Sequence, residues 1–204
     1  MGTVTDQIQG QPHGGRGARQ RILWAANKLF YEEGINATGM ERLTAVAHVS
    51  RRSFYQHFPS KDALVEEYLR QMEGTQAPRG EQALSRPELP PRERLLELFT
   101  DPARQVLRGC PFHNAAVETA GALPAVQEAV IRHKRDFTQR LIDTAAEAGA
   151  LDPRALGRQL AVLFEGATAL ATSLNDPSPV KDARGAAAAL IDAATRPAQP
   201  DTVP

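Results

Sequence analysis

The sequence has almost no cysteine, few aromatic residues and no long apolar run. One of its 204 residues is a cysteine, Cys110, and aromatic residues make up 5%. A single cysteine excludes a disulfide within the chain and a cysteine-based metal site, and we expect neither a metal nor a cofactor. No apolar stretch approaches the roughly 20 residues of a membrane span, and residues 1–15 are polar and glycine-rich, unlike a secretory signal. These absences predict a cytoplasmic protein with no membrane partner.

The chain also has no net charge, but its charges are unevenly distributed. Between Arg16 and Lys61 eight basic residues face three acidic ones, a net charge of +5. From Asp62 onward 16 basic residues face 20 acidic ones. A basic module joined to an acidic one is typical of a protein that binds DNA at one end.

The apolar residues recur at helical spacing, and no segment alternates as a strand does, so we predict an all-α fold. A segment rich in proline, glycine and glutamine, from Gly74 to Pro91, predicts a loop or linker. Helices are expected over residues 18–33, 38–47, 51–58, after Ser60 through at least residue 72, over 92–99, from 111 to about 121, over 124–148, from 153 to about 174, and from 179 or 180 to about 195. Asp101-Pro102 is expected to break the helical structure after residue 99.

Three of the N-terminal helices have recognisable start signals. Thr38 and Glu41 have the spacing of a capping box, which makes Thr38 the expected N-cap of the second helix. Ser50 is a natural N-cap for a third helix that Pro59 ends, and Ser60 is one for the fourth. These signals predict a short turn between the second and third helices.

That arrangement predicts a helix-turn-helix, in which the second helix of the motif enters the major groove. Arg51 and Arg52 lie on the first turn of this helix, and an arginine can donate two hydrogen bonds to one guanine. Tyr55 and Lys61 are placed to contact phosphates, which fixes the register on DNA without reading sequence.

The segment from Val49 to Leu64 resembles the signature of the TetR family of bacterial regulators. The shared pattern is Val-Ser, then Phe-Tyr-x-His-Phe-x-Ser-Lys-x-x-Leu, and it extends back through Leu43 and Gly34 to Arg21. The resemblance implies an all-helical homodimer with a three-helix DNA-binding head and a larger effector-binding body. It also implies DNA contacts from Thr38, Arg51, Arg52, Ser53, Tyr55, His57 and Lys61.

On this basis we expect four segments: a disordered tail (1–15), a helix-turn-helix domain (16–63), an effector-binding and dimerisation domain (64–195) and a second disordered tail (196–204).

Several residues of the motif allow more than one interpretation. His48 occupies a turn position that is commonly glycine in the family, so either this histidine adopts a left-handed conformation or the turn differs. Gly39 stands where a second threonine is frequent, which weakens one expected phosphate contact. Phe54 and Phe58 are expected in the core. His57 could contact DNA or be a solvated surface residue.

The most distinctive stretch of the body begins Gly-Cys-Pro-Phe at Gly109, similar to a segment that borders the effector cavity in one group of TetR regulators. We expect a partly hydrophobic small-molecule effector to be bound by a few polar groups among apolar walls. The expected lining consists of Cys110, Phe112, Asn114, Glu118, Phe137 and Phe164. The alternative is that the three phenylalanines are ordinary core residues. Cys110 could sense redox state, or be a small buried residue.

The last two helices are rich in small residues on more than one face, which indicates burial on both sides and hence a helix-pair interface between two subunits. A two-fold dimer presents two recognition helices to successive major grooves, so its operator is an inverted repeat of double-stranded DNA.

The leading hypothesis is a transcriptional repressor that a small-molecule effector releases from its operator. One alternative is a DNA-binding activator without an effector. Another is a small helical enzyme with Cys110 as nucleophile, His113 as base and Glu118 as orienting group, although no nucleophile elbow is present.

Overall fold

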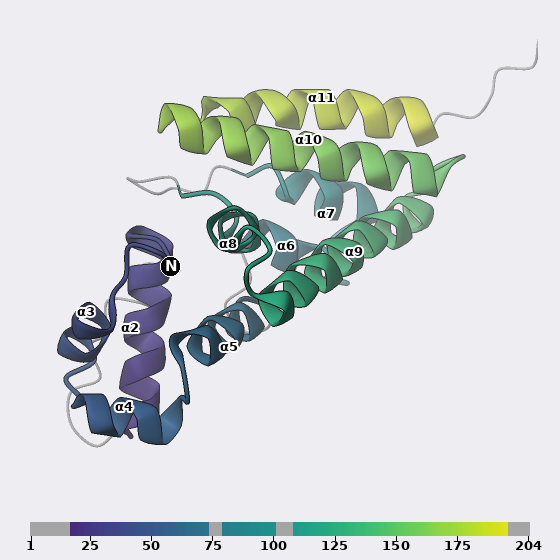
Figure 1. Ribbon diagram of the computed structural model, residues 1–204. Helices are drawn as coiled ribbons and strands as arrows, with labels where there is room; N and C mark the ends of the chain where they lie inside the picture. The colour runs from purple at the N-terminus through teal and green to yellow at the C-terminus, as the bar shows by residue number, and fades with distance from the viewer. Residues whose placement is uncertain (1–16, 74–78, 101–107, 196–204) are drawn as a thin grey trace, which may run out of the picture. The chain divides into compact units, whose positions relative to one another are not determined.

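The computed structural model describes residues 17–73, 79–100 and 108–195, and the regular structure of these residues is entirely helical (Figure 1). The prediction of an all-α fold is therefore confirmed. None of the described helices is both long and apolar enough to cross a membrane. The helices are α2 (Ala18–Glu32), α3 (Met40–Val46), α4 (Arg51–His57), α5 (Lys61–Glu73), α6 (Arg79–Ala83), α7 (Pro91–Glu97), α8 (Pro111–Thr119), α9 (Pro124–Glu147), α10 (Pro153–Leu174) and α11 (Ser178–Thr195).

The chain divides into two compact units. Of the described residues, the first unit holds 17–73 and 108–133, and the second holds 79–100 and 134–195. Helix α9 contributes residues to both. The boundary predicted after residue 63 falls inside the first unit, because α5 and α8 share its apolar core. The predicted division into a DNA-binding head and an effector-binding body does not coincide with these two units, and it remains a proposal about function.

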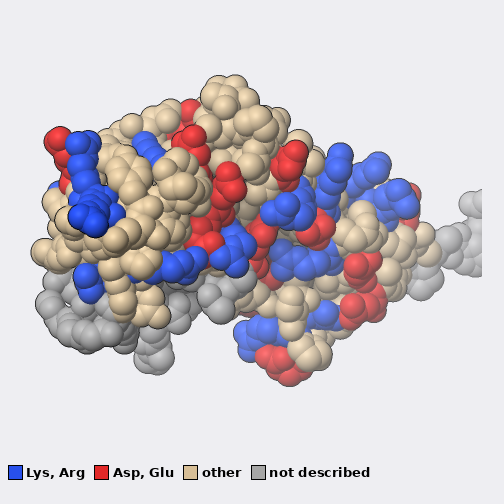
Figure 2. Space-filling model, turned by 60° about the horizontal axis from the view of Figure 1, so that its bottom comes forward, with Lys and Arg blue, Asp and Glu red and all other residues tan. Residues whose placement is uncertain are grey.

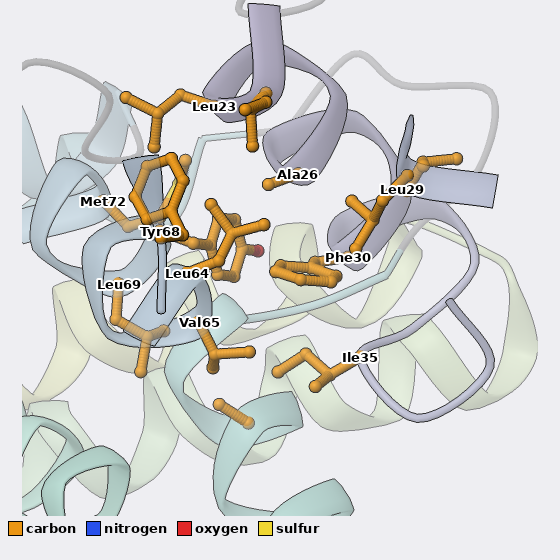
Figure 3. Close-up of a cluster of buried hydrophobic side chains, with 14 of the residues drawn as sticks. Leu23, Ala26, Leu29, Phe30, Ile35, Leu64, Val65, Tyr68, Leu69 and Met72 are labelled. Carbon is orange, nitrogen blue, oxygen red and sulfur yellow. The ribbon is translucent and has the colours of Figure 1, made fainter. Parts of the chain in front are cut away.

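The core of the first unit forms where α2 meets α5 (Figure 3). Leu29 and Phe30 of α2 are buried, and the Phe30 ring meets the edge of Tyr68 from α5 at a centroid distance of 5.5 Å. The buried residues of α5 are Leu64, Val65, Tyr68, Leu69 and Met72. Phe54 and Phe58 are also buried, so their assignment to the core is confirmed.

The second unit contains the long helices α10 and α11, which pack through small and branched residues. Leu160 and Ala171 of α10, and Ala187 and Ile191 of α11, are all buried. A Cβ atom at Gly157 would lie 2.8 Å from the backbone of Ile142, so glycine is required where α10 passes α9. The small residues thus allow close helix packing within one subunit.

The structure corrects two predictions, the start of one helix and the absence of helix from one segment. Helix α3 begins at Met40 with Gly39 as its N-cap, not at Thr38, because the Thr38 hydroxyl donates back to the Gly34 carbonyl oxygen at 2.6 Å. The predicted loop from Gly74 to Pro91 contains the short helix α6. The two predicted tails and the expected helix break at residues 101–102 lie outside the described residues.

The other start signals are confirmed. The hydroxyl oxygen of Ser50 accepts from the Ser53 N–H at 3.1 Å, and that of Ser60 accepts from the Ala63 N–H at 3.0 Å. Each of these contacts satisfies an N–H group that has no partner within the helix.

Candidate nucleic-acid interface

Helices α3 and α4 form a helix-turn-helix whose turn is centred on His48. This residue has φ 52°, so of the two alternatives that its sequence position left open, the structure shows the left-handed conformation. Its N–H donates to the Ala45 carbonyl at 3.2 Å, and the Val49 N–H donates to the Thr44 carbonyl at 3.0 Å. These bonds end α3 and direct the chain to Ser50, the N-cap of α4.

Helix α4 has one buried and one exposed face. Phe54 is fully buried and anchors the helix, whereas the Tyr55 side chain is 52% exposed. Arg51 and Arg52, on the first turn, and His57, on the last, are exposed, and Ser53 is half-buried. An exposed helix face that begins with two arginines is suited to groove contacts.

Gln56 is also exposed on α4, and it was not among the residues predicted from the sequence. It lies four residues after Arg52 and hence on the same side of the helix. Glutamine can bond two positions of adenine, so Gln56 joins the candidates for base contact. The helical spacing from Arg52 was the available signal.

Lys61 is half-buried at the start of α5. Burial lowers the pKa of its amine, and the nearby carboxylates of Asp62 and Glu118 oppose this change. A lysine in this position can meet a phosphate as a point charge.

Thr38 does not fit the predicted role. It is fully buried, and its hydroxyl is bonded to the Gly34 carbonyl, so its side chain is unavailable to DNA in this conformation. The residue stabilises the turn between α2 and α3 instead.

Lys and Arg side chains lie on the surface of the first unit, where α3 and α4 are seen at the left of Figure 2. Some of this charge is neutralised within the unit: Arg42 bonds Glu33 at 2.7 Å, and Glu67 accepts from both Arg19 and Arg70. The Glu33 pKa is accordingly lowered, chiefly by its hydrogen bond with Arg42.

The six residues predicted to line an effector cavity fall in different units. Cys110 and Phe112 belong to the first, with Asn114 and Glu118, whereas Phe137 and Phe164 belong to the second. All three phenylalanines are buried, as the alternative core interpretation expected.

The polar members of the set have identified partners in the first unit. The Asn114 amide donates to the Arg108 carbonyl at 2.6 Å, and the Glu118 carboxylate accepts from the Asn36 N–H at 2.8 Å. The Phe112 ring stacks on the buried His133 imidazole, with centroids 3.6 Å apart and planes within 4°.

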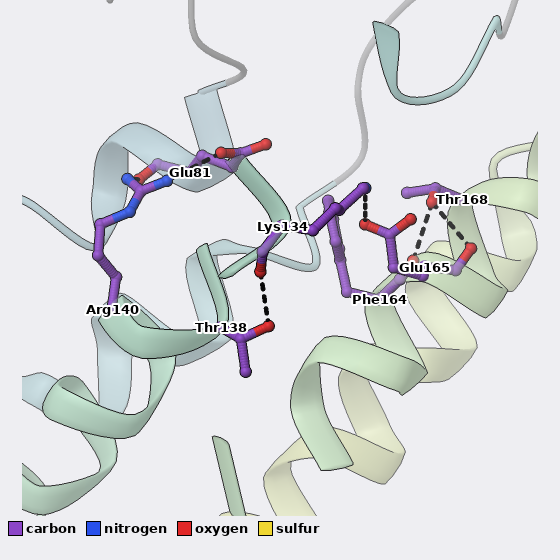
Figure 4. A network of polar contacts seen from close by, with 7 residues as sticks. All are labelled: Glu81, Lys134, Thr138, Arg140, Phe164, Glu165 and Thr168. Carbon is purple, nitrogen blue, oxygen red and sulfur yellow. Dashed lines mark hydrogen bonds and ion pairs between the residues drawn. The ribbon is translucent and has the colours of Figure 1, made fainter. Parts of the chain in front are cut away.

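In the second unit, a group of charged residues that was not predicted from the sequence lies on α6, α9 and α10 (Figure 4). Arg140 Nη2 bonds Glu81 Oε2 at 3.0 Å, and Lys134 pairs with Glu165. Burial raises the pKa of Glu81, and Arg140 opposes that rise. The partners lie 59 and 31 residues apart, so local sequence patterns carried no signal for either pair.

Comparison with known proteins identifies the family. The family model for bacterial regulatory proteins of the tetR family matches residues 22–68, and that for the tetracyclin repressor-like C-terminal domain matches residues 91–187. A TetR-family transcriptional regulator from Streptomyces coelicolor is 33% identical, with a TM-score of 0.76 over 88% of this chain and 90% of that chain. The chain belongs to the TetR family.

Two further relatives agree with this assignment. A putative TetR regulator from Streptomyces avermitilis is 30% identical, with a TM-score of 0.69 over 84% of this chain and 98% of that one. The HTH-type transcriptional repressor DhaR of Mycobacterium sp. strain GP1 is 26% identical over 141 residues, covering 65% of this chain and 69% of DhaR.

Membership of the TetR family makes the chain a DNA-binding transcriptional regulator and removes the enzyme alternative, because the matched proteins are regulators. TetR regulators bind DNA operators and usually act as dimers with small-molecule effectors. Cys110 lies half-buried before α8, and His113 is exposed on that helix.

Proposed function

We propose that this TetR-family protein is a homodimeric repressor that binds an inverted-repeat operator and leaves it when a small molecule binds. The observation that carries the proposal is the exposed face of α4, which begins with Arg51 and Arg52 and is held from behind by the buried Phe54. Such a helix can enter a major groove without disturbing its own core.

The side chains of this surface have different roles in the proposal. Arg51, Arg52 and Ser53 read bases, because they lie on the first turn of the recognition helix. Tyr55, His57 and Lys61 hold phosphates and set the register. Gln56 is added to the base-reading group, and Thr38 is withdrawn from the DNA contacts.

The homodimer is supported by an exposed stripe of small residues along α10 and α11. Among the described residues, no heavy atom beyond the neighbouring helix backbone lies within 4 Å of the position that a Cβ would occupy at Gly166 on α10 or at Gly185 on α11. Beside them Val162 is 74% exposed, and Ala169 and Ala189 are exposed as well. Two copies of such a surface can pack closely, giving a four-helix interface.

The repressor role is supported by the relation to DhaR, which is named a repressor. Release by an effector requires a ligand that binds one conformation better than the other. We expect the effector to be partly hydrophobic. The candidate contacts are Cys110 and Phe112 in the first unit and, as a separate set, Phe137 and Phe164 in the second. An activator that needs no effector remains the alternative.

A binding assay with matched variants tests the DNA-binding roles. A duplex is first selected from a random-sequence library by the wild-type protein, and its affinity is compared with that of a scrambled duplex. We expect Arg52→Ala to reduce the preference for the selected duplex by about tenfold or more. Lys61→Ala should weaken binding to both duplexes and make the salt dependence less steep. Equal loss of preference in both variants would contradict the assigned roles.

A ligand screen tests whether a small molecule releases the protein from DNA. A compound that raises the thermal midpoint of the protein should also lower its affinity for the selected duplex. The same compound would leave that affinity unchanged if the protein were an activator without effector control.

A further inference from the structure

Helix α8 is attached to the DNA-binding end of the first unit by a reciprocal pair of hydrogen bonds. The Glu118 carboxylate accepts from the Asn36 N–H at 2.8 Å, and the Asn36 side-chain amide donates to the Glu118 carbonyl oxygen at 2.6 Å. Asn36 lies in the loop between α2 and α3, 82 residues before Glu118. Two directional bonds with different donors fix the orientation as well as the separation of the two segments.

Each bond gives a hydrogen-bond partner to a backbone group at the end of a helix or in a loop. Glu118 is in the last turn of α8, where carbonyl oxygens have no partner within the helix, and the Asn36 amide supplies one. In return the Glu118 carboxylate pairs the N–H of an exposed loop residue. Truncation of either side chain therefore removes one bond and leaves the other.

Close packing confirms that the contact is specific. Gly34, which ends α2 with φ 104°, would place a Cβ only 3.1 Å from Glu118 Oε2. Ile35, directly before Asn36, is buried in the core beside α5 (Figure 3). The loop is thus held from one side by apolar contacts and from the other by Glu118.

The segment before α8 attaches to α2 at a second place. Arg108 Nε donates to the Tyr31 carbonyl oxygen at 3.1 Å, and the Tyr31 hydroxyl donates to the Gly109 carbonyl at 3.4 Å. The last turn of α2 and the loop after it are therefore both held by α8 or its flanking segment. Helix α2 in turn bonds the helix-turn-helix, through Arg21 and Ala47.

We propose that Asn36 and Glu118 are positioning residues for operator binding: their paired hydrogen bonds hold the α2–α3 loop so that α3 and α4 keep the arrangement that the operator requires. The inference rests on the proposed function and adds its regulation, because a displacement of α8 reaches the helix-turn-helix through this pair. It replaces the effector-lining role predicted for Glu118.

The pair of variants Glu118→Ala and Glu118→Gln isolates the hydrogen bond from the charge. Both remove a negative charge close to Lys61, but glutamine keeps an oxygen that accepts from the Asn36 N–H. We expect Glu118→Ala to bind the selected duplex at least fivefold more weakly than Glu118→Gln, with the scrambled duplex bound equally by both. Asn36→Ala should cause a similar loss from the other side, and the double variant should lose less than the two single losses combined.

Two further measurements separate positioning from stability. The exposed Glu128, in the same unit on α9, gives the control Glu128→Ala, which should bind as the wild type does. Thermal midpoints are recorded for all variants, and affinities are measured well below them, where loss of stability alone leaves affinity unchanged.

Equal affinity of Glu118→Ala and Glu118→Gln for the selected duplex would overturn the inference, as would wild-type affinity of Asn36→Ala. If Glu118→Ala does not fold, Asn36→Ala decides the question. A wild-type protein that selects no duplex would overturn the proposed function and this inference with it. If the wild type selects a duplex and Glu118→Ala and Asn36→Ala lose affinity for it as expected, the result supports both the proposed function and this inference.

Discussion

Arg21 of α2 donates its Nε hydrogen to the carbonyl oxygen of Ala47, at 3.1 Å, directly before the left-handed turn residue His48. This bond fixes the end of α3 and thereby the start of the recognition helix. Because the donor is charged and partly buried, we expect Arg21→Met to lower the free energy of unfolding by about 1.5 kcal/mol. Denaturant titration measures this loss, and operator affinity should fall with it.

The matched control for Arg21 is Arg86→Met. Arg86 pairs with Glu88 at 2.7 Å, but both side chains are more than half exposed. A surface pair of this kind contributes little, so the loss should stay below about 0.5 kcal/mol. Equal losses in the two variants would show that the Arg21 bond has no special role.

The left-handed conformation of His48 makes a stabilising substitution available. His48 has φ 52°, and its side chain is exposed, so His48→Gly relieves backbone strain without removing a buried contact. Glycine also makes the unfolded chain more flexible, which offsets part of the gain. We expect the free energy of unfolding to rise by about 0.5 kcal/mol, as measured by denaturant titration.

Two alanines of α8 serve as comparisons for His48. Ala120, the C-cap, has φ 43°, so Ala120→Gly should also stabilise the protein. Ala116 is exposed within the helix, where glycine should destabilise the protein by about 1 kcal/mol. A loss at all three positions would refute the strain argument.

Features set by local chemistry were predictable from the sequence. Ser50 and Ser60 cap their helices, because each cap depends on residues within a few positions. The left-handed conformation of His48 was one of two alternatives that its place in the turn left open. Thr38 misled the prediction, because its hydroxyl has a competing acceptor in the carbonyl of Gly34. This one bond accounts for two errors: the predicted start of α3 and the prediction that Thr38 contacts DNA.

Features set by distant contacts were not predictable. Helix α6 lies in a segment with the composition of a loop, but Gly80 allows it to approach Leu98, whose carbonyl oxygen would be 2.8 Å from a Cβ there. Likewise, Glu118 had the spacing of a pocket residue on α8, and its partner Asn36 lies 82 residues away. One sequence contains no pattern that joins such partners.

We expect the stability of the protein to depend on pH because of the buried Glu81. It is 3% exposed, and burial raises its pKa above the ordinary value while Arg140 opposes the rise. The folded state therefore binds this proton more tightly than the unfolded state does. The resulting stabilisation is complete below the unfolded pKa of about 4.3 and is lost as the pH rises through the folded pKa.

The variant Glu81→Gln removes this titration. Between pH 4.5 and pH 8 the stability of the wild type should therefore decline relative to that of Glu81→Gln, as followed by denaturant titration at a fixed protein concentration. The exposed Glu93, in the same unit on α7, gives the control Glu93→Gln, which changes the net charge equally but leaves the Glu81 carboxyl in place. If the wild type instead became more stable relative to Glu81→Gln as the pH rises, the pH dependence assigned to Glu81 would have the wrong sign.

The proposed subunit interface on α10 can be tested with one substitution made at two places. Val162, on α10, is 74% exposed, and Val117, on α8, is 65% exposed. If α10 and α11 form the dimer interface, Val162→Asp buries an unpaired charge there and shifts the mass in sedimentation velocity toward the monomer at micromolar concentration. Val117→Asp should leave the dimer intact. The monomeric variant should also lose affinity for an inverted repeat while keeping that for a half-site, because Val162 lies outside the apolar core of the first unit, which contains the helix-turn-helix. A wild type that sediments as a monomer would rule out the homodimer itself.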